Sequence, residues 1–339
     1  MDDTSAGADD WDFASLTPDR ILGDLETLGW RCDGRMLALN SYENRVYQIG
    51  IEDDDPVVAK FYRPGRWSAD ALREEHRFVA ELDERDVPVV AALQSTATGE
   101  RLNYCNPWWI AVYPRRGGYA LEMDQAEQLY RVGQVLGRLH LVGEQRAFEW
   151  RPELNSVDFG DRAIERVLAS ALVPTDMRAV YDGVANDLLT RVKRALEDYG
   201  EITRLRLHGD CHASNVLVRD ERLLLVDFDD ARSGPAIQDI WLFLSGDTAS
   251  RNAALAELVE GYEEFRAFPL RELALIAPLA SLRLLHYAGW LAERWTDPAF
   301  PAAFPWFGEA RYWDQHVLDL REQIAAMQEP HGLKVAPGL

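Results

Sequence analysis

The sequence HGDCHASNVLVRDERLLLVDFDD occupies residues 208–230 and contains the polar residues from which the rest of the chain can be interpreted. Two short apolar runs separated by a polar turn connect Asn215 to Asp227, which predicts a β-hairpin. A hairpin returns the chain to its starting edge, so Asp227 should come back to the loop that holds Asp210 and Asn215. The sequence therefore predicts that three polar side chains converge at the open end of one hairpin.

Asp210 and Asn215 have the D-x4-N spacing found in a phosphate-transferring catalytic loop. In such a loop the aspartate accepts the proton of a hydroxyl group, and the asparagine helps to hold a metal ion. Mg²⁺ takes carboxylate and amide oxygens as ligands and completes its shell with water and nucleotide phosphates. We therefore expect Asp210 and Asp227 to be catalytic, Asn215 and Asp227 to bind Mg²⁺, and ATP to donate the phosphoryl group.

Two other interpretations of this stretch need to be weighed. A single aspartate at a strand end is more often a turn or cap residue, because its side chain bonds to its own backbone. The convergence of three polar groups favours the catalytic interpretation. His208 and His212 are four residues apart with Cys211 between them, which raises the alternative of a zinc site. Gly209 and the following strand interrupt any helix, so we expect His208 to orient the loop by hydrogen bonding.

A second element lies upstream, where residues 57–61 read Val-Val-Ala-Lys-Phe and resemble a strand whose lysine reaches the α- and β-phosphates of a nucleotide. Glu75 is the only acidic residue on the apolar stripe of the helix predicted over 69–85, and a carboxylate on a buried face needs a partner. We expect Lys60 and Glu75 to form that pair. The alternatives are a lysine that extends to solvent and Glu74 as the partner, although Glu74 lies about 100° around the helix from the stripe.

The turn at 41–45, Ser-Tyr-Glu-Asn-Arg, occupies the position of a phosphate loop but contains no glycine, the residue that usually lets backbone approach a phosphate. Ser41 can offer a hydroxyl group and its N–H to ATP, and Arg45 can add positive charge. An ordinary hairpin turn fits the sequence nearly as well. The aromatic run 108–114 contains Tyr113, whose backbone groups would read the edge of the adenine just before a hinge. An aromatic core strand is the alternative for this run.

The elements predicted around these residues form two parts of different character. Residues 16–113 should contain a helix that begins after Thr17, the helix over 69–85, and strands near 37–39, 46–49, 57–61, 89–93 and 109–113. A linker at 114–118 follows. Residues 119–330 are mainly helical around the hairpin, with periodic segments at 124–142, 176–199, 251–266 and 270–294. We predict an α+β, bilobal fold with a small antiparallel β N-lobe and a larger, mainly helical C-lobe, flanked by a loose acidic N-terminus at 1–15 and a C-terminal tail at 331–339.

The composition excludes several classes of protein. With 36 Lys and Arg against 57 Asp and Glu, the net charge of −21 repels a polyanion and argues against nucleic-acid binding. No apolar run reaches 18 residues, and the acidic N-terminus lacks the features of a signal peptide, so we expect no membrane association and a cytoplasmic location. Three cysteines without a CxxC pair fit a reducing compartment. We expect the protein to be a monomer.

Several blocks together carry a family resemblance. HGDCHASN with VDFDD, the turn NSYENRVYQ, the strand VVAKFY and the helix residues REEH resemble the aminoglycoside-phosphotransferase-like kinase superfamily, from about residue 16 to residue 330. The resemblance implies a protein-kinase-like fold, Asp210 as proton acceptor, Asn215 and Asp227 as metal ligands, and contact of Ser41 with ATP. It also implies a bacterial serine/threonine protein kinase of the stress response that uses ATP, Mg²⁺ and a protein acceptor.

The sequence departs from ordinary protein kinases at points that bear on regulation. Gly209 stands where the His-Arg-Asp motif has arginine, and Asp229 stands where the Asp-Phe-Gly motif has glycine. Only eleven residues separate Asp227 from Asp239, which leaves no long activation loop. We therefore expect no regulation by loop phosphorylation. Asp239 should brace the catalytic loop or cap a helix.

Two further function classes fit parts of the sequence. A small-molecule kinase for an aminoglycoside, homoserine or choline-like alcohol would use the same catalytic loop, and an acidic chain would suit a cationic acceptor. Nine aromatic residues at 287–313 would form a floor for such a substrate, although packing of the terminal helices is their commoner use. A nucleotide-binding regulatory module without turnover is the third class. The presence of every expected catalytic residue argues against this third class, because a module without turnover does not need them.

Overall fold

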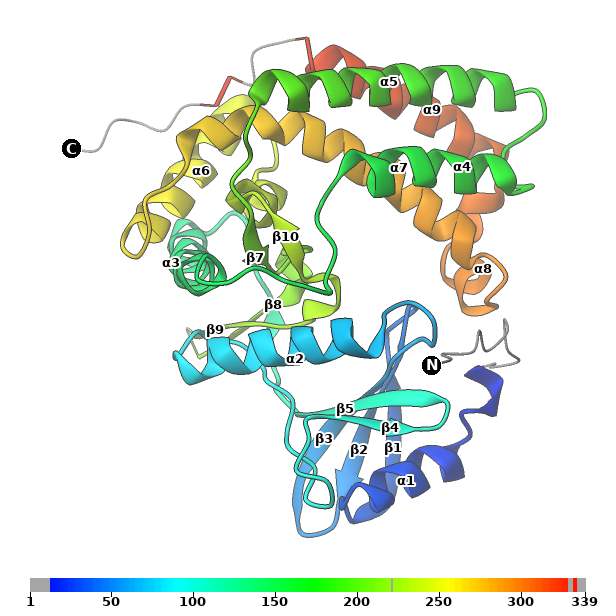
Figure 1. Ribbon diagram of the computed structural model, residues 1–339, viewed down its shortest axis with the longest axis vertical. Coiled ribbons are helices and arrows are strands. Elements are labelled where there is room, and N and C mark those ends of the chain that lie inside the picture. The colour runs from blue at the N-terminus through cyan, green and yellow to red at the C-terminus, as the bar shows by residue number, and fades with distance from the viewer. Residues whose placement is uncertain (1–12, 221, 329–331, 334–339) are drawn as a thin grey trace, which may run out of the picture. The chain divides into compact units, whose positions relative to one another are not determined.

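The computed structural model describes residues 13–220, 222–328 and 332–333. The chain divides into two compact units, Met1–Gly118 and Tyr119–Leu339. The first unit contains an antiparallel sheet and the second is mainly helical (Figure 1). The predicted α+β fold class is therefore confirmed.

Most of the two predicted terminal segments lies outside the described residues. Within 1–15 only Phe13–Ser15 are described, and within 331–339 only residues 332 and 333. Phe13–Ser15 form a short 3₁₀ helix, η1, and the ring of Phe13 stacks on Trp108 with 5.1 Å between the centroids. Phe13 is therefore packed against the sheet, while Ala14 and Ser15 are exposed.

From residue 13 onward, the first unit is one antiparallel sheet of five strands accompanied by two α-helices (Figure 1). After η1 its elements are α1 (Pro18–Thr27), β1 (Cys32–Leu39), β2 (Arg45–Ile51), β3 (Asp54–Phe61), α2 (Ala69–Glu84), β4 (Leu102–Cys105) and β5 (Trp108–Pro114). The strands lie in the order β1-β2-β3-β5-β4. Lys60 on β3 pairs with Val46 of β2 on one side and Ala111 of β5 on the other, so the lysine lies in the central strand.

Both helices of this unit begin where local chemistry predicts. The Thr17 hydroxyl accepts the N–H of Arg20 at 3.4 Å, and Pro18 occupies the first turn of α1. The Ser68 hydroxyl accepts the N–H of Ala71 at 3.1 Å at the start of α2. Every residue of the predicted apolar stripe of α2 is buried, namely Leu72, Glu75, Phe78, Val79 and Leu82. The periodicity argument for this helix is confirmed.

The strand predicted near 89–93 is not present, and β4 is the edge strand instead. Val89 and Ala92 are buried and contribute to the core. The N–H of Val89 bonds locally to the carbonyl of Val87, and only Leu93 donates to β5, at the Val112 carbonyl. Burial without a ladder of backbone hydrogen bonds makes a covered loop rather than a strand.

The second unit contains two small sheets among its helices. Its elements are β6 (Tyr119–Ala120), α3 (Ala126–Gly143), the π-helix η2 (Val157–Asp161), α4 (Arg162–Ala169), α5 (Arg178–Tyr199), β7 (Leu205–Leu207), η3 (Ala213–Asn215), β8 (Val216–Arg219), β9 (Arg222–Leu225), η4 (Phe228–Asp230), β10 (Arg232–Gly234), η5 (Ala236–Asp239), η6 (Trp241–Phe243), α6 (Thr248–Glu263), η7 (Leu270–Leu275), α7 (Ile276–Arg294), α8 (Ala299–Ala303), η8 (Pro305–Gly308) and α9 (Ala310–Ala326). The β8–β9 pair is the predicted hairpin, with Val216 opposite Leu225. β6 extends that sheet, and β10 pairs with β7.

Helices α4, α5, α7 and α9 surround the main core of this unit (Figure 1). Among the nine aromatic residues at 287–313, Phe300, Phe307 and Trp313 are fully buried in that core. These three residues therefore pack the core, whereas Tyr287 and Trp306 are exposed. Leu270–Arg294 is long and apolar enough to cross a membrane, but 56% of its apolar window is buried among the neighbouring helices, as in the core helix of a soluble protein.

Helices α3 and α6 approach each other closely because glycines lie at their contact. A Cβ atom at Gly133 would lie 2.1 Å from the carbonyl oxygen of Leu258, and one at Gly261 would lie 2.0 Å from that of Tyr130. Backbone atoms cannot move aside as a side-chain tip can. Glycine is therefore required on both helices for this packing distance.

We expect Gly133→Ala to destabilise the protein by about 1–3 kcal/mol, because the new methyl group would force α3 and α6 apart. Thermal unfolding should show this as a fall in Tm of roughly 2–4 °C per kcal/mol. Gly183→Ala is the matched control, since that exposed glycine of α5 has open space around its Cβ position. The control should raise the stability by up to about 1 kcal/mol. Equal Tm values for the two variants would contradict the close-contact argument.

Candidate catalytic and metal-binding site

The predicted catalytic loop begins where β7 ends, and a buried carboxylate fixes its backbone. Asp239 accepts the N–H of His208 at Oδ2 and the N–H of Gly209 at Oδ1, both at 2.8 Å. Gly209 has φ +87°, and a Cβ atom there would lie 2.1 Å from the carbonyl oxygen of Asp230. Only glycine fits this position, so the structure has no room for the arginine that the His-Arg-Asp motif carries.

Asp239 is itself held by the surrounding helices. His140 of α3 places Nε2 at 3.2 Å from Asp239 Oδ2, and its Nδ1 lies 3.0 Å from the hydroxyl of Tyr262 on α6. The short helix that carries Asp239 is supported at its start by Glu272, which accepts the N–H of Ile237 at 2.9 Å. Asp239 therefore braces the catalytic loop.

His208 has the orienting role that the sequence predicts. Its Nε2 lies 2.9 Å from the carbonyl oxygen of Val226, and its ring packs against Phe228 at 4.5 Å between centroids. These contacts join the start of the loop to the end of the hairpin.

Each carboxylate oxygen of Asp210 faces a basic group. Arg283 of α7 donates from Nη1 to Oδ1 at 2.5 Å, and Nε2 of His212 lies 3.4 Å from Oδ2. Burial raises the pKa of Asp210, but the hydrogen bond with His212 and the positive charge of Arg283 together outweigh it and hold the pKa well below its usual range. The carboxylate is therefore ionised at neutral pH, the state in which it can accept a proton.

The hairpin places Asn215 and Asp227 at the same end of the small sheet. The N–H of Val226 donates to the carbonyl of Asn215 at 3.0 Å, just beyond the last ladder pair. The side-chain amide of Asn215 donates to the carbonyl of Asp210 at 3.0 Å. The structure thus brings together the three residues that the spacing singled out.

Asp227 has φ 64° and ψ 67°, a left-handed conformation that is uncommon for a residue with a Cβ atom. Such a conformation persists where surrounding contacts fix it. Buried Arg151 donates to the carbonyls of Asp229 at 2.5 Å and Ala231 at 2.7 Å. Buried Arg232 donates to the carbonyl of Asp230 at 2.8 Å. Two guanidinium groups therefore hold the segment that follows Asp227.

The side chains present fit a hard divalent cation. Asn215 uses its Nδ2 in the bond to Asp210, and in the part of the chain that the structure describes its Oδ1 has no hydrogen-bond partner. This oxygen and the Asp227 carboxylate are suitable ligands for such an ion, which would draw the rest from water and phosphate. Among the described residues there is no cluster of three or more His, Cys, Asp or Glu side chains that would hold a metal. Cys211, the cysteine of the zinc alternative, is fully buried, and burial raises the pKa of its thiol well above its usual value.

The expected nucleotide-binding residues all lie in the first unit, and Tyr62 contacts three of them. Lys60 and Glu75 are both buried. The Tyr62 hydroxyl donates to Glu75 Oε1 at 3.4 Å, and the ammonium group of Lys60 lies 4.9 Å from the centre of the Tyr62 ring. The same hydroxyl lies 3.2 Å from that of Tyr113. Glu74, the competing residue, is more exposed than Glu75. The Lys60–Glu75 pair and the adenine contact of Tyr113 stay predictions.

The turn that contains Ser41 is held by arginines instead of being shaped by glycine. Buried Arg63 donates to the carbonyl of Glu43 at 3.0 Å and pairs with the carboxylate of Glu43 at 2.8 Å. The backbone N–H of Arg63 donates to Asn44 Oδ1 at 3.0 Å. Arg45 donates to the carbonyl of Tyr42 at 3.0 Å. Arg45 therefore supports the turn, whereas the sequence suggested only a charge toward phosphate.

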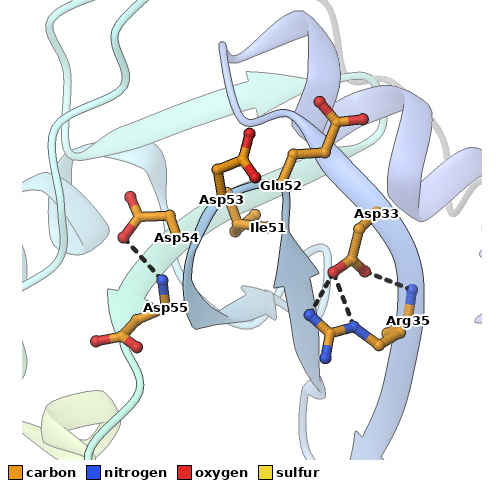
Figure 2. A pocket seen from close by; sticks show the side chains of 7 residues that line it. All are labelled: Asp33, Arg35, Ile51, Glu52, Asp53, Asp54 and Asp55. Atoms are coloured by element: carbon orange, nitrogen blue, oxygen red, sulfur yellow. Dashed lines mark hydrogen bonds and ion pairs between the residues drawn. The ribbon is translucent and has the colours of Figure 1, made fainter.

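A separate pocket on the five-stranded sheet of the first unit is acidic (Figure 2). Its carboxylates belong to Asp33, Glu52, Asp53, Asp54 and Asp55. Figure 2 shows Arg35 bound to Asp33, with Nε 2.8 Å from Oδ2. The remaining negative charge repels phosphate, and the pocket contains none of the expected site residues. It is therefore not a nucleotide site.

In each unit, several residues that contact the predicted site residues have no signal in the local sequence. Arg283 lies 73 positions after Asp210, and Arg151 lies about 80 positions before the carbonyls that it binds. His76 and Tyr62 form the hydrogen bond of 2.9 Å beside Glu75. The sequence signal for the Tyr62–His76 contact is limited to the position of His76, which follows Glu75 on the buried side of α2.

Comparison with known proteins gives consistent results. Residues 36–276 match the family model described as "Phosphotransferase enzyme family". A relative from Salmonella choleraesuis (strain SC-B67), named Stress response kinase A, is 42% identical over 318 residues, covering 94% of this chain and 95% of that protein. A relative from Salmonella typhimurium, named Serine/threonine protein kinase RdoA, has the same identity and coverage. The solved structure of an amicoumacin kinase in complex with AMP-PNP, Ca²⁺ and Ami has a TM-score of 0.72 and 17% identity, covering 95% of this chain and 97% of that one, and is similar in fold.

Glu272, which supports the Asp239 segment, should make the stability depend on pH. Burial raises its pKa to about 7, although the N–H groups of Ile237 and Ala236 and the charge of Arg266 oppose this. Since the folded pKa exceeds the unfolded value, the stability contributed by protonated Glu272 is present below about pH 4.5 and is lost as the pH rises to 7. We expect Glu272→Gln to be more stable than the wild type by about 1–3 kcal/mol at pH 8 and to match it near pH 4.5.

Thermal unfolding across that pH range measures the difference. Glu260→Gln, an exposed glutamate of α6, is the control and should shift Tm little at any pH. A Glu272→Gln difference that does not change with pH would contradict this account.

Proposed function

Because the chain belongs to the phosphotransferase enzyme family, we propose that it is a Mg²⁺-dependent serine/threonine protein kinase that acts in a stress response. ATP-dependent transfer to a hydroxyl acceptor follows from the family and from the kinase names of the relatives. The protein acceptor is supported by a relative named as a serine/threonine protein kinase, which matches 94% of this chain at 42% identity. The stress response is supported by the name of another relative at the same identity.

One observation carries the proposal for the site: Asp210, Asn215 and Asp227 lie at one end of a hairpin. The Asn215 amide donates to the Asp210 carbonyl, and the N–H of Val226, the residue before Asp227, donates to the Asn215 carbonyl. Asp210, ionised, would orient the acceptor hydroxyl and take its proton as the new O–P bond forms and the bond from the β–γ bridging oxygen to the γ-phosphorus breaks. Asn215 and Asp227 would hold the Mg²⁺. That ion supplies charge neutralisation at the phosphate oxygens.

The first unit would bind the nucleotide. In this proposal Lys60 contacts the α- and β-phosphates, Glu75 pairs with Lys60, Ser41 contacts ATP through its hydroxyl and N–H, and Tyr113 lies at the adenine edge. Buried Lys60 and Glu75, which share the neighbour Tyr62, support the first two roles. The arginine-braced turn supports a fixed position for Ser41.

The active geometry would need no activating phosphate. Arg151 and Arg232 bind the carbonyls of the segment after Asp227, and Gly209 leaves no loop arginine for a phosphate to pair with. We further propose a monomer in the cytoplasm without membrane or nucleic-acid partners. The net charge of −21 and the free thiols of Cys32, Cys105 and Cys211 support this location.

Transfer of radiolabel from ATP tests the acceptor class. The protein should label a generic protein substrate on Ser or Thr, read by gel and phosphoamino-acid analysis, and should label aminoglycosides, homoserine and choline far less, read by chromatography. Treatment of the enzyme with a phosphatase beforehand should leave the initial rate unchanged. Label found only in a small alcohol would move the assignment to a small-molecule kinase, and a rate that collapses after phosphatase treatment would contradict the preformed site.

Two substitutions separate the roles of the aspartates. Asp210→Asn should keep nucleotide binding but lower kcat by about 10²–10⁴-fold, because it removes the proton acceptor. Asp227→Ala should instead abolish Mg²⁺-dependent nucleotide binding, measured by calorimetry, because it removes the charged metal ligand. Near-normal kcat in the first variant, or unchanged MgATP affinity in the second, would show that the role is misassigned.

A further inference from the structure

Arg283 is a partly exposed cation beside the predicted proton acceptor. It projects from α7 and reaches Asp210 Oδ1 with Nη1 at 2.5 Å, while 38% of its side chain is accessible to solvent. Within the described ranges this is the one hydrogen bond or ion pair that Arg283 makes, so Nε and Nη2 remain available as donors. A guanidinium group with open donors can bind a carboxylate through two parallel hydrogen bonds.

The position of Arg283 relative to the acceptor follows from the chemistry of the reaction. A hydroxyl group that gives its proton to Asp210 must come within about 3 Å of one of its carboxylate oxygens. Oδ1 is bonded to Arg283 and Oδ2 lies 3.4 Å from His212. Any group attached next to the acceptor hydroxyl therefore lies within a few ångströms of the Arg283 guanidinium.

We propose that Arg283 is an acceptor-specificity residue, which binds a carboxylate adjacent to the hydroxyl that is phosphorylated and disfavours acceptors that carry a cation there. The inference rests on the proposed function, and it narrows the protein acceptor to Ser or Thr with an acidic neighbour. The chain as a whole is strongly negative, with a net charge of −21, and would attract cations at long range. Arg283 instead places a positive charge beside the acceptor hydroxyl and offsets the negative charge of Asp210 there.

A purely orienting role for Arg283 makes a different prediction. If the residue only held the Asp210 carboxylate in place, its loss would lower kcat by the same factor for every acceptor. A residue that contacts the acceptor instead changes the ratio of kcat/KM between acceptors of different charge. The ratio is therefore the quantity to measure.

The test uses the full-length enzyme and three peptides that differ only in the residue after a single serine, which is Glu, Gln or Lys. The wild type should prefer Glu over Gln, and Gln over Lys, by about five-fold at each step, the size of a partly exposed ion pair. Arg283→Met should make the three kcat/KM values equal within about two-fold, and Arg283→Lys should keep part of the preference. Arg294→Met removes a positive charge from the same helix, where Arg294 pairs with Glu293. This control should keep the wild-type ratios.

A wild type without charge preference, or an Arg283→Met enzyme that keeps the wild-type ratios while losing rate equally on all peptides, would overturn the proposal. Tm and MgADP affinity establish that each variant is folded, and Arg283→Gln replaces Arg283→Met if the latter is not. Glycolate and ethanolamine are measured in parallel as small alcohols of opposite charge. Label only in these alcohols would disprove the protein-kinase function. The ratio of kcat/KM for glycolate to that for ethanolamine, compared between the wild type and the Arg283 variant, would still decide the present inference. No transfer to any acceptor would overturn both.

Discussion

The carboxylate of Asp239 accepts the backbone N–H groups of His208 and Gly209 in a region with no exposure to solvent. A buried carboxylate is costly unless hydrogen bonds and a positive or polar partner surround it, and here two N–H groups and His140 provide them. Because these bonds fix the two residues before Asp210, the direction in which Asp210 leaves the loop is set by Asp239. The positions of Asn215 and the hairpin follow, since Asn215 bonds to the carbonyl of Asp210.

The opposite side of the same loop depends on buried arginines. Asp227 adopts a left-handed conformation, and the carbonyls that follow it are bound by Arg151 and Arg232. Each of these guanidinium groups donates to backbone oxygens of this segment, Arg151 to two and Arg232 to one, and so limits the movement of the segment. A short segment held at three successive carbonyls has few alternative arrangements. These contacts hold the Asp227 region within the fold.

Individual basic residues lie beside the proposed phosphate-transfer residues although the chain as a whole is strongly acidic. The chain is strongly acidic, and the acidic pocket on the first sheet is one place where that charge gathers. The residues with a proposed role in phosphate transfer are surrounded differently: Lys60 is buried in the central strand, and Arg283 lies against Asp210. Screening and distance weaken the effect of remote carboxylates, whereas a cation in direct contact acts at full strength.

The sequence by itself determined the features that depend on neighbouring residues. The D-x4-N spacing, the β8–β9 hairpin and the buried position of Glu75 on α2 all follow from short-range pattern, and the structure has the hairpin and the buried glutamate where the pattern places them. The strand predicted at 89–93 was wrong because the apolar residues there are buried without a ladder of backbone hydrogen bonds to a neighbouring strand. Such pairing is not a local property.

Tertiary structure alone decided which distant residues meet at the site. Arg283 reaches Asp210 across 73 positions, Arg151 reaches the segment after Asp227 from the loop beyond α3, and Asp239 receives N–H groups from about 30 positions earlier. These contacts require helices to pack at defined distances, as the glycines between α3 and α6 allow. A periodic pattern states which face of a helix is buried, but it carries no information about which other element covers that face.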